Sequence, residues 1–183
     1  MRILGYIFFL ALLRPNKGAH LLIEAVAKLK ESLKGWKIVI AGKDNEHYAS
    51  FLKKLIIQYQ LEDMISLPGA LYGEDKWNMY KKADFFVLPT LNENFGIVIA
   101  EALLCGTPVI TCKGAPWNGL IDNHCGWWVD RTVEDITDAL SKAIKLQENE
   151  IKEMGIRGRN FIINNYSSNL VAKQIINIYQ SLL

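Results

Sequence analysis

The sequence predicts an α/β protein with a Rossmann-like parallel sheet and helices on both faces. Strand-like and helix-like patterns alternate along the chain, which is typical of parallel strands joined by covering helices. Short apolar runs such as 36–41 and 85–88 are each followed by a longer segment with helical spacing of apolar residues. The chain has 183 residues, 50% of them hydrophobic, which suits one domain with a sizeable core.

Each expected element has a local reason. Strands are expected where apolar runs end at glycine, proline or a polar turn, namely up to residue 13 and over 36–41, 64–67, 85–88, 108–111 and 127–129. Helices are expected where apolar residues recur every three or four positions, over 19–33, 46–59, 74–82, 95–105, 133–146, 151–165 and 168–182. Gly35 is expected to stop the first helix, and the region around Gly114, Pro116 and Gly119 is expected to be turns.

The N-terminal run has two interpretations. Arg2 is followed by the apolar stretch 3–13, which has the charge and length of a signal-peptide core. No small-x-small cleavage site follows, and the run is too short to span a bilayer. A buried first strand of a parallel sheet explains the same residues, and we favour that interpretation.

Composition excludes several classes of function. The net charge is +2 and 22% of residues are charged, which is a globular balance that does not call for nucleic acid. Lysines are denser between residues 28 and 37, as expected for a solvated face or a weak contact with an anionic membrane. The three cysteines and three histidines show no metal-binding or triad spacing, so we expect free thiols and neither a zinc site nor a triad.

Two glutamates mark a candidate site after the run 85–88. Glu93 follows this predicted strand in a polar turn, and Glu101 lies inside the predicted helix 95–105. Ligands of an open parallel sheet bind outside the carboxyl ends of the strands. A helix start there offers unpaired N–H groups and a positive dipole end, which suit a phosphate. Glu101 is about 7.5 Å along the helix from Gly96 at about 1.5 Å per residue, which fits the span from a pyrophosphate to its ribose.

The segment 89–109 resembles the E-x7-E motif of retaining GT-B glycosyltransferases of family 4, the group 1 glycosyl transferases. That family's pattern is roughly P-[ST]-x-x-E-x-F-G-x-x-x-x-E-A-x-x-x-G-x-P-V, and the matching residues here are Pro89, Thr90, Glu93, Phe95, Gly96, Glu101, Ala102, Gly106, Pro108 and Val109. The tail around 154–179 is similar to the usual family ending. The resemblance implies that residues 1–183 are a single nucleotide-sugar-binding domain, the C-terminal half of a GT-B fold, without the acceptor domain that normally precedes it.

The resemblance also implies roles for particular residues. Glu93 would contact the donor sugar or help to position its leaving group, and Glu101 would accept hydrogen bonds from both ribose hydroxyls. Lys17, in the dipeptide Lys17-Gly18, would bind the diphosphate as a flexible cation. The helix start would meet phosphate or sugar, mainly through backbone N–H groups, with the residues Asn94, Phe95, Gly96, Ile97 and Val98. The loop expected to contact the base contains Gly69 and Leu71.

One position departs from the family pattern. Relatives carry an arginine five or six residues before the lysine, where this chain has Leu12 or Ala11. Arg14 is the nearest candidate for that arginine, and it would serve only if the loop were rearranged. Loss of a cation beside a developing charge costs about 10²–10³ in rate. The domain is therefore expected to be either an impaired transferase or a binding module.

Two functions stay open from the sequence. One is the donor-binding domain of a retaining glycosyltransferase that moves a hexose from a nucleotide diphosphate sugar to a surface-polysaccharide or glycolipid acceptor, with the acceptor-binding domain in trans or missing from this chain. Residues 115–120 resemble relatives that act on lipopolysaccharide or capsule acceptors. The other is a non-catalytic nucleotide-sugar-binding or accessory module, or a degenerate fragment. We expect no cofactor, no metal because no D-x-D motif is present, and a location in the cytoplasm or at the inner face of the membrane.

Overall fold

The computed structural model describes residues 5–167 and residue 172. Its strands are β1 (Tyr6–Leu10), β2 (Lys37–Ala41), β3 (Ile65–Gly69), β4 (Phe85–Leu88), β5 (Val109–Cys112) and β6 (Gly126–Val129). Its helices are the short 3₁₀ helix η1 (Pro15–Lys17), α1 (Ala19–Lys28), α2 (Tyr48–Gln58), α3 (Gly73–Lys82), α4 (Ile97–Leu104), α5 (Gly119–Asp122), α6 (Val133–Ala143) and α7 (Glu148–Tyr166).

The strands form one parallel sheet in the order β3-β2-β1-β4-β5-β6. This order reverses direction between β1 and β4, which are neighbours although the chain passes through two other strands between them. Ile7 lies opposite Ile38 of β2 on one side and Phe85 of β4 on the other, and all three side chains are fully buried. The predicted fold class, a Rossmann-like sheet, is confirmed.

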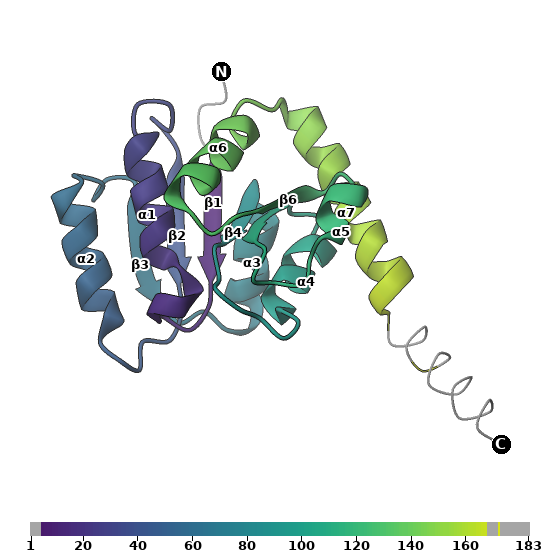
Figure 1. The fold of residues 1–183 in the computed structure, drawn as a ribbon, viewed down its shortest axis with the longest axis horizontal. Coiled ribbons are helices and arrows are strands. Elements are labelled where there is room, and N and C mark those ends of the chain that lie inside the picture. Colours follow the sequence, from purple (N-terminus) through teal and green to yellow (C-terminus); the bar gives the residue numbers. More distant parts are fainter. Residues whose placement is uncertain (1–4, 168–171, 173–183) are drawn as a thin grey trace.

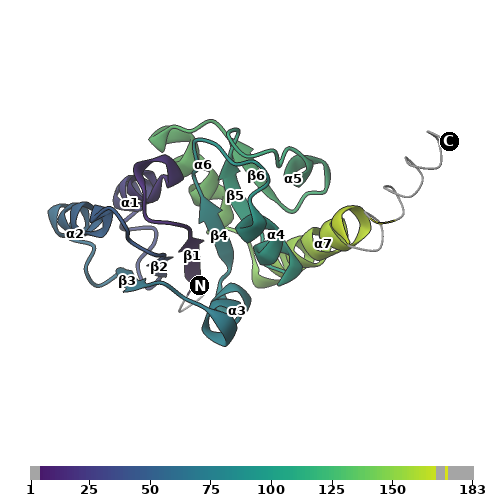
Figure 2. The same cartoon turned by 90° about the horizontal axis from the view of Figure 1, so that it is seen from below.

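Helices cover both faces of the sheet, as Figures 1 and 2 show. Helices α1, α2 and α6 pack together on one face, while α3, α4 and α7 pack on the other. Strands β1, β4 and β5 are buried along almost their whole length between these layers. Such double coverage explains why their sequences are continuous apolar runs rather than alternating patterns.

Several predicted boundaries are wrong by a few residues. The first strand ends at Leu10 rather than near residue 13, and α1 ends at Lys28, with turns rather than helix up to Gly35. The helix predicted over 95–105 begins only at Ile97, because Gly96 adopts a left-handed conformation with φ of 81°. The expected turn region contains the short helix α5, which spans too few residues to show a period. The helix predicted over 168–182 lies, apart from residue 172, outside the described residues.

The N-terminal apolar run forms the strand β1 in the middle of the sheet. Ile7, Phe8 and Phe9 have no exposed surface. This burial confirms the strand interpretation for Tyr6–Leu10. Among the described residues, no helix is both long enough and apolar enough to cross a bilayer.

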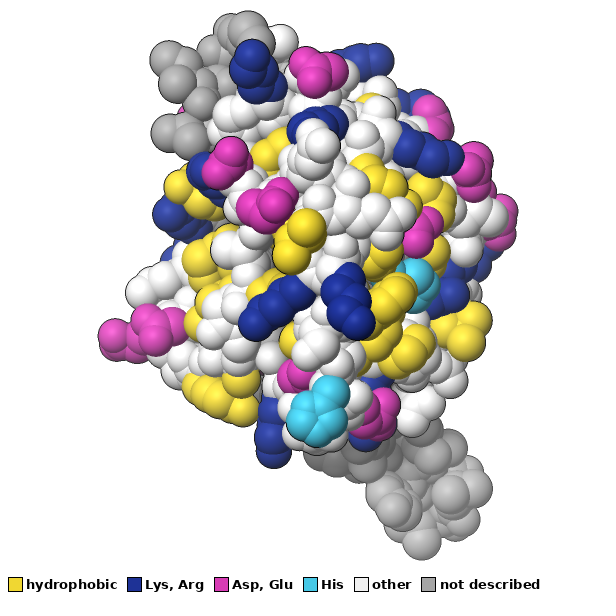
Figure 3. Space-filling model, turned by 90° about the vertical axis from the view of Figure 1, so that its left-hand side faces the viewer, with side chains coloured by type: hydrophobic (Ala, Val, Ile, Leu, Met, Phe, Trp, Pro, Cys, Tyr) yellow, Lys and Arg dark blue, Asp and Glu magenta, His cyan; other side chains and the backbone are white. Residues whose placement is uncertain are grey.

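The surface over α2 and β3 mixes charges of both signs. Figure 3 shows basic, acidic and apolar side chains interspersed there, with no large region of one sign. In the predicted lysine-rich segment, Lys28 pairs with Glu134 at 2.5 Å, and Lys37 donates to the backbone carbonyl of Asp63 at 2.6 Å. These contacts are those of a solvated face, and the membrane contact stays a prediction.

Candidate functional site

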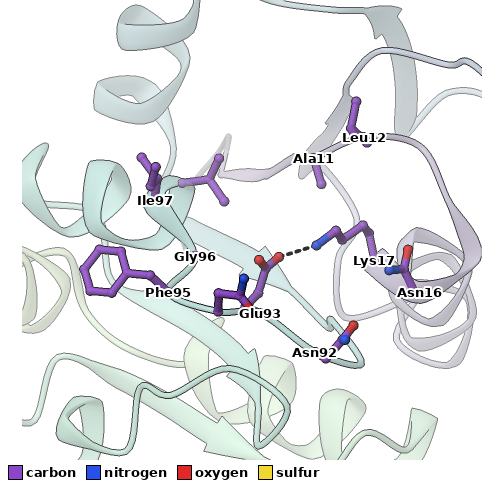
Figure 4. A pocket seen from close by; sticks show the side chains of 11 residues that line it. Ala11, Leu12, Asn16, Lys17, Asn92, Glu93, Phe95, Gly96 and Ile97 are labelled. Carbon is purple, nitrogen blue, oxygen red and sulfur yellow. Dashed lines mark hydrogen bonds and ion pairs between the residues drawn. The ribbon is translucent and has the colours of Figure 1, made fainter.

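A cleft of about 570 Å³ opens where the strand order reverses. The loop after β1 and the loop after β4 form its walls (Figure 4). These two loops lead to helices on opposite faces of the sheet, α1 and α4 (Figure 2). Ligands of doubly wound sheets bind at this point, outside the carboxyl ends of the strands. The residues that line the cleft are Ala11, Leu12, Asn16, Lys17, Asn92, Glu93, Asn94, Phe95, Gly96, Ile97 and Val98.

Lys17 and Glu93 form an ion pair across the cleft. Lys17 Nζ donates to Glu93 Oε1 at 2.6 Å, and the two side chains are only 18% and 16% exposed. They are 76 residues apart in the sequence, and the adjacency of β1 and β4 brings them together. The site therefore holds one lysine ammonium and one carboxylate in direct contact, close to a helix start.

The two loops touch through their backbones. Leu91 N–H donates to the carbonyl of Asn16 at 2.7 Å. Gly18, which precedes α1, has φ of 77°, and a Cβ there would lie 2.1 Å from the carbonyl oxygen of Pro89. A side chain at position 18 would therefore push the loops apart. This close approach explains why a glycine follows Lys17: without a side chain at position 18, Lys17 can lie beside the β4 loop.

Helix α4 begins at the floor of the cleft without a side-chain cap. Gly96 is its N-cap residue, and no side chain accepts a hydrogen bond from the first turn. Ile99 N–H already donates to the carbonyl of Gly96 at 2.8 Å, so the preceding N–H groups, those of Ile97 and Val98, are the ones that the first turn offers to an anion in the cleft. Below the start, Trp117 is fully buried and its indole N–H donates to the carbonyl of Phe95, which holds the loop in place. Trp117 is thus a core residue.

Glu101 lies one turn further along α4 and faces α3. Lys76 Nζ contacts its Oε1 at 2.6 Å, and the Tyr80 hydroxyl donates to its Oε2 at 3.0 Å. Burial, together with the negative charge of Glu101, raises the pKa of Tyr80 far above its usual range, so the hydroxyl keeps its proton. Both carboxylate oxygens of Glu101 are therefore oriented by partners from α3. Sequence reasoning missed these partners, although the spacing of 76 and 80 places them on one helix face.

The remaining predicted residues lie at different places. The residues at the α4 start line the cleft, namely Asn94, Phe95, Gly96, Ile97 and Val98, and so does Leu12, whose side chain is 43% exposed; their contact with phosphate or sugar stays a prediction. Arg14 is outside the lining, with its Nε 2.9 Å from Glu46 Oε1. Gly69 is the last residue of β3 and Leu71 lines a separate hollow beside α3. Sequence reasoning overlooked two amide side chains of the lining, Asn16 and Asn92.

The described residues offer little other reactive chemistry. They bring no three of His, Cys, Asp and Glu together in an arrangement that could hold a metal. Cys112 and Cys125 are buried, and burial raises their pKa to about 12 and about 11, while Cys105 is half-buried with a raised pKa. The thiols are therefore protonated near neutral pH, and the three cysteines are free, as predicted. The absence of a metal from the reaction stays a prediction.

A family model settles the lineage of this chain. The model described as "Glycosyl transferases group 1" matches residues 5–161. The chain belongs to the group 1 glycosyl transferases. The predicted family is thereby confirmed.

Relatives with known names agree with this membership. WcaL of Escherichia coli K12, named as a colanic acid biosynthesis glycosyltransferase, is 26% identical over 96% of this chain and 45% of its own length. The glycosyltransferase MJ1607 of Methanocaldococcus jannaschii is 29% identical over 95% of this chain and 44% of its length. A D-inositol 3-phosphate glycosyltransferase of Mycolicibacterium smegmatis is 30% identical over 74% of this chain and 34% of its length. This group 1 chain thus spans less than half the length of each.

Solved structures show the same fold. A glycosyltransferase from Rickettsia africae superposes with a TM-score of 0.86 at 23% identity, over 99% of this chain and 48% of that one. Anabaena HepE, solved with UDP and glucose, superposes with a TM-score of 0.82 at 20% identity, over 98% of this chain and 49% of that one. The C-terminal domain of LpcC from Francisella tularensis superposes with a TM-score of 0.76 at 23% identity, over 90% of this chain and 86% of that one. These likenesses confirm that this group 1 chain has the fold of the C-terminal domain of a GT-B glycosyltransferase.

Proposed function

We propose that the cleft between the β1 and β4 loops binds a nucleotide diphosphate sugar as the donor of a hexosyl transfer. The observation that carries this proposal is the convergence of a cation, Lys17, with the uncapped start of α4 in one hollow at the reversal of strand order. A diphosphate needs both a positive charge and fixed N–H donors. HepE, which shares this fold, was solved with UDP and glucose, and this supports the same ligand class here.

In the proposed binding mode, the nucleotide extends along the carboxyl edge of the sheet. The diphosphate lies at the start of α4 and is contacted by Lys17. Glu101 receives the ribose hydroxyls; its side chain is 17% exposed, and its bonds to Lys76 and Tyr80 leave lone pairs for further donors. The base lies towards the end of β3, near Gly69 and Leu71.

In the proposed reaction, the bond between the sugar C1 and the β-phosphate oxygen breaks, and C1 forms a bond to a hydroxyl oxygen of the acceptor. The nucleoside diphosphate leaves with the bonding electron pair, and its leaving oxygen takes up the proton that the acceptor hydroxyl gives up. Lys17 and the start of α4 stabilise the charge on the leaving diphosphate. Glu93 contacts the sugar once Lys17 turns to the phosphates. We propose retention of configuration at C1 and a metal-independent reaction.

The acceptor is proposed from the names of relatives alone. WcaL is named for colanic acid biosynthesis, which supports a surface polysaccharide acceptor, and the name of the inositol 3-phosphate enzyme supports a small polar acceptor. The acceptor would be held by a second domain, in the same protein or on another chain. We place the reaction in the cytoplasm or at the inner face of the membrane.

A second candidate function is binding of the donor without catalysis. Leu12 favours it, because this apolar side chain lines the cleft where the family pattern expects an arginine. Donor turnover separates the two candidates. Release of free sugar or of a glycosylated acceptor supports the transferase, and proton NMR of the anomeric centre reports retention. Tight donor binding with no release of nucleoside diphosphate, measured with the acceptor-binding domain present, supports the binding module.

Calorimetry tests donor binding directly, with UDP, GDP and ADP compared with their nucleosides. We expect one diphosphate to bind, and Glu101→Ala to weaken it by about 1.5–3 kcal/mol, the value of hydrogen bonds to a charged group. Glu134→Ala is the matched control, since Glu134 also pairs with a lysine but lies in α6, on the opposite face of the sheet from the helix α4 that carries Glu101. No binding of any of the three at millimolar ligand would refute the proposed function. Equal binding by Glu101→Ala would refute the ribose role.

A further inference from the structure

Arg131 joins the two loops of the cleft from outside. It follows β6, and its Nε donates to the carbonyl of Pro89 at 3.0 Å while its Nη2 donates to the carbonyl of Pro15 at 3.0 Å. Pro89 begins the loop that carries Glu93, and Pro15 begins the short helix that carries Lys17. One guanidinium therefore bridges the backbones that present the cation and the carboxylate, although Arg131 is not part of the cleft lining.

One of the two bridged carbonyls, that of Pro89, lies at a close contact between the loops. The Pro89 carbonyl that accepts from Arg131 is the same one that lies against Gly18, where a Cβ would approach within 2.1 Å. Next to it, Leu91 N–H donates to Asn16 O at 2.7 Å. A guanidinium across this contact fixes both the separation and the register of the loops.

The bridge requires an arginine. A guanidinium presents N–H donors in a planar, rigid fork, and a charged donor makes a stronger hydrogen bond to a carbonyl than a neutral one. An ammonium is a point charge on a flexible stem and cannot reproduce the geometry of two donors directed at two carbonyls. Replacement of Arg131 by lysine therefore keeps the charge and removes the fork.

We propose that Arg131 is a positioning residue for donor binding, which fixes Lys17 relative to the start of α4 so that both meet one diphosphate. This role rests on the proposed function. It acts through Lys17 and the α4 start rather than through contact with the ligand. Misplacement of binding groups by about 1 Å costs up to about a hundredfold in catalysis, which is why a residue behind the loops can matter.

Loop coupling is tested first without any ligand. In Arg131→Ala we expect faster amide hydrogen exchange in residues 11–18 and 89–96, with the Leu91 amide as the main reporter because its acceptor lies across the loop contact. Arg157→Ala is the matched control, since Arg157 Nε also donates to a backbone carbonyl, that of His124, at 3.0 Å but away from the cleft. Unchanged exchange in both segments of Arg131→Ala would overturn the inference, whatever the protein binds.

Ligand affinity tests the positioning role. We expect Arg131→Ala to lower nucleoside diphosphate affinity about tenfold, within the range of coupling in one hydrogen-bond network, and to leave nucleoside affinity unchanged. Arg131→Lys should recover less than half of this loss on a logarithmic scale. Full recovery by lysine would show that charge alone matters and would overturn the positioning role. Equal losses for nucleoside and diphosphate would also overturn it, because they would indicate a general loss of structure.

A double-mutant cycle with Lys17→Met separates positioning from stability. If Arg131 acts through Lys17, Arg131→Ala should weaken diphosphate binding much less in the Lys17→Met background than in the parent. A structural role would lower the melting temperature equally in both backgrounds and would leave the two effects on binding additive, which would overturn the inference. If the parent binds no diphosphate, the proposed function fails and the positioning role fails with it, while the exchange result still reports on the bridge.

Discussion

Removal of the charge of Lys17 is the most informative perturbation of this domain. Lys17→Met keeps most of the apolar stem and removes the ammonium that lies 2.6 Å from Glu93 Oε1. In the free protein the change leaves Glu93, 16% exposed, without its partner. In the complex it removes the proposed diphosphate cation. One substitution therefore tests both the stability of the site and its ligand.

The expected magnitudes follow from the burial of the pair. Exposed ion pairs contribute up to about 1 kcal/mol, and removal of one partner of a buried pair costs about 3–5 kcal/mol. Both side chains are less than one-fifth exposed without being fully buried, so we expect Lys17→Met to lower the free energy of unfolding by about 2 kcal/mol. That corresponds to a fall of about 4–8 °C in melting temperature for a domain of this size. The lost contact with a diphosphate should cost a further 1.5–3 kcal/mol in binding, or about 10–150-fold in affinity.

Thermal unfolding and calorimetry measure the two effects on the same protein. Lys113→Met is the matched control, because Lys113 pairs with Asp130 at 2.8 Å but both side chains are at least half exposed. We expect the control to shift the melting temperature by no more than about 2–4 °C and to leave diphosphate binding unchanged.

The reasoning also predicts the behaviour of the double variant. Adding Glu93→Gln to Lys17→Met removes the unpaired charge, so stability should recover towards the parent while diphosphate affinity stays low. A melting temperature of Lys17→Met equal to that of Lys113→Met would refute the structural importance of the pair. Unchanged diphosphate affinity in Lys17→Met would refute the placement of the phosphates beside the β1 loop.

Three further changes follow from the structure. Gly18→Ala should lower the free energy of unfolding by about 2–4 kcal/mol, because φ of Gly18 is 77° and the added Cβ would lie 2.1 Å from the Pro89 carbonyl oxygen. Gly73→Ala is the control: φ of Gly73 is 49° and nothing lies within 4 Å of the added Cβ, so the loss should be only about 1–2 kcal/mol. Equal losses in the two variants would contradict the close approach at Gly18. Leu12→Arg should strengthen diphosphate binding by about 1–2 kcal/mol without changing nucleoside binding, because the side chain at position 12 is exposed in the cleft. If calorimetry shows no gain, position 12 is not where the arginine of the family pattern would act. Burial, with a smaller effect of Arg131, holds the pKa of His20 below its usual value of 6.5. Below about pH 6.5 the imidazole of His20 therefore takes up a proton more readily in the unfolded chain than in the folded one, so the free energy of unfolding falls as the pH decreases. His20→Gln should therefore lose less melting temperature than the parent between about pH 7.5 and about pH 5.5, and an equal loss would contradict this assignment.

The sequence was sufficient for the fold class and for the loops that carry the cleft. Local periodicity reports which face of an element is buried, so the alternation of apolar runs and helical patterns predicted the parallel sheet. The Pro89–Gly96 segment and the Lys17-Gly18 dipeptide marked the loops after β4 and β1 through residue types that turns and helix starts require. The roles of individual residues in binding stay predictions until the affinities are measured.

Only the tertiary structure decided how these parts meet. The adjacency of β1 and β4 pairs Lys17 with Glu93, and the packing of α3 against α4 supplies Lys76 and Tyr80 to Glu101. Arg131 reaches both loops only because β6 ends beside them. A sequence pattern reports the burial of a residue's own element, whereas these contacts depend on strand order, register and the free energy of packing distant segments. Local residue types therefore predicted the binding edge of the sheet, and long-range packing determined which side chains orient one another there.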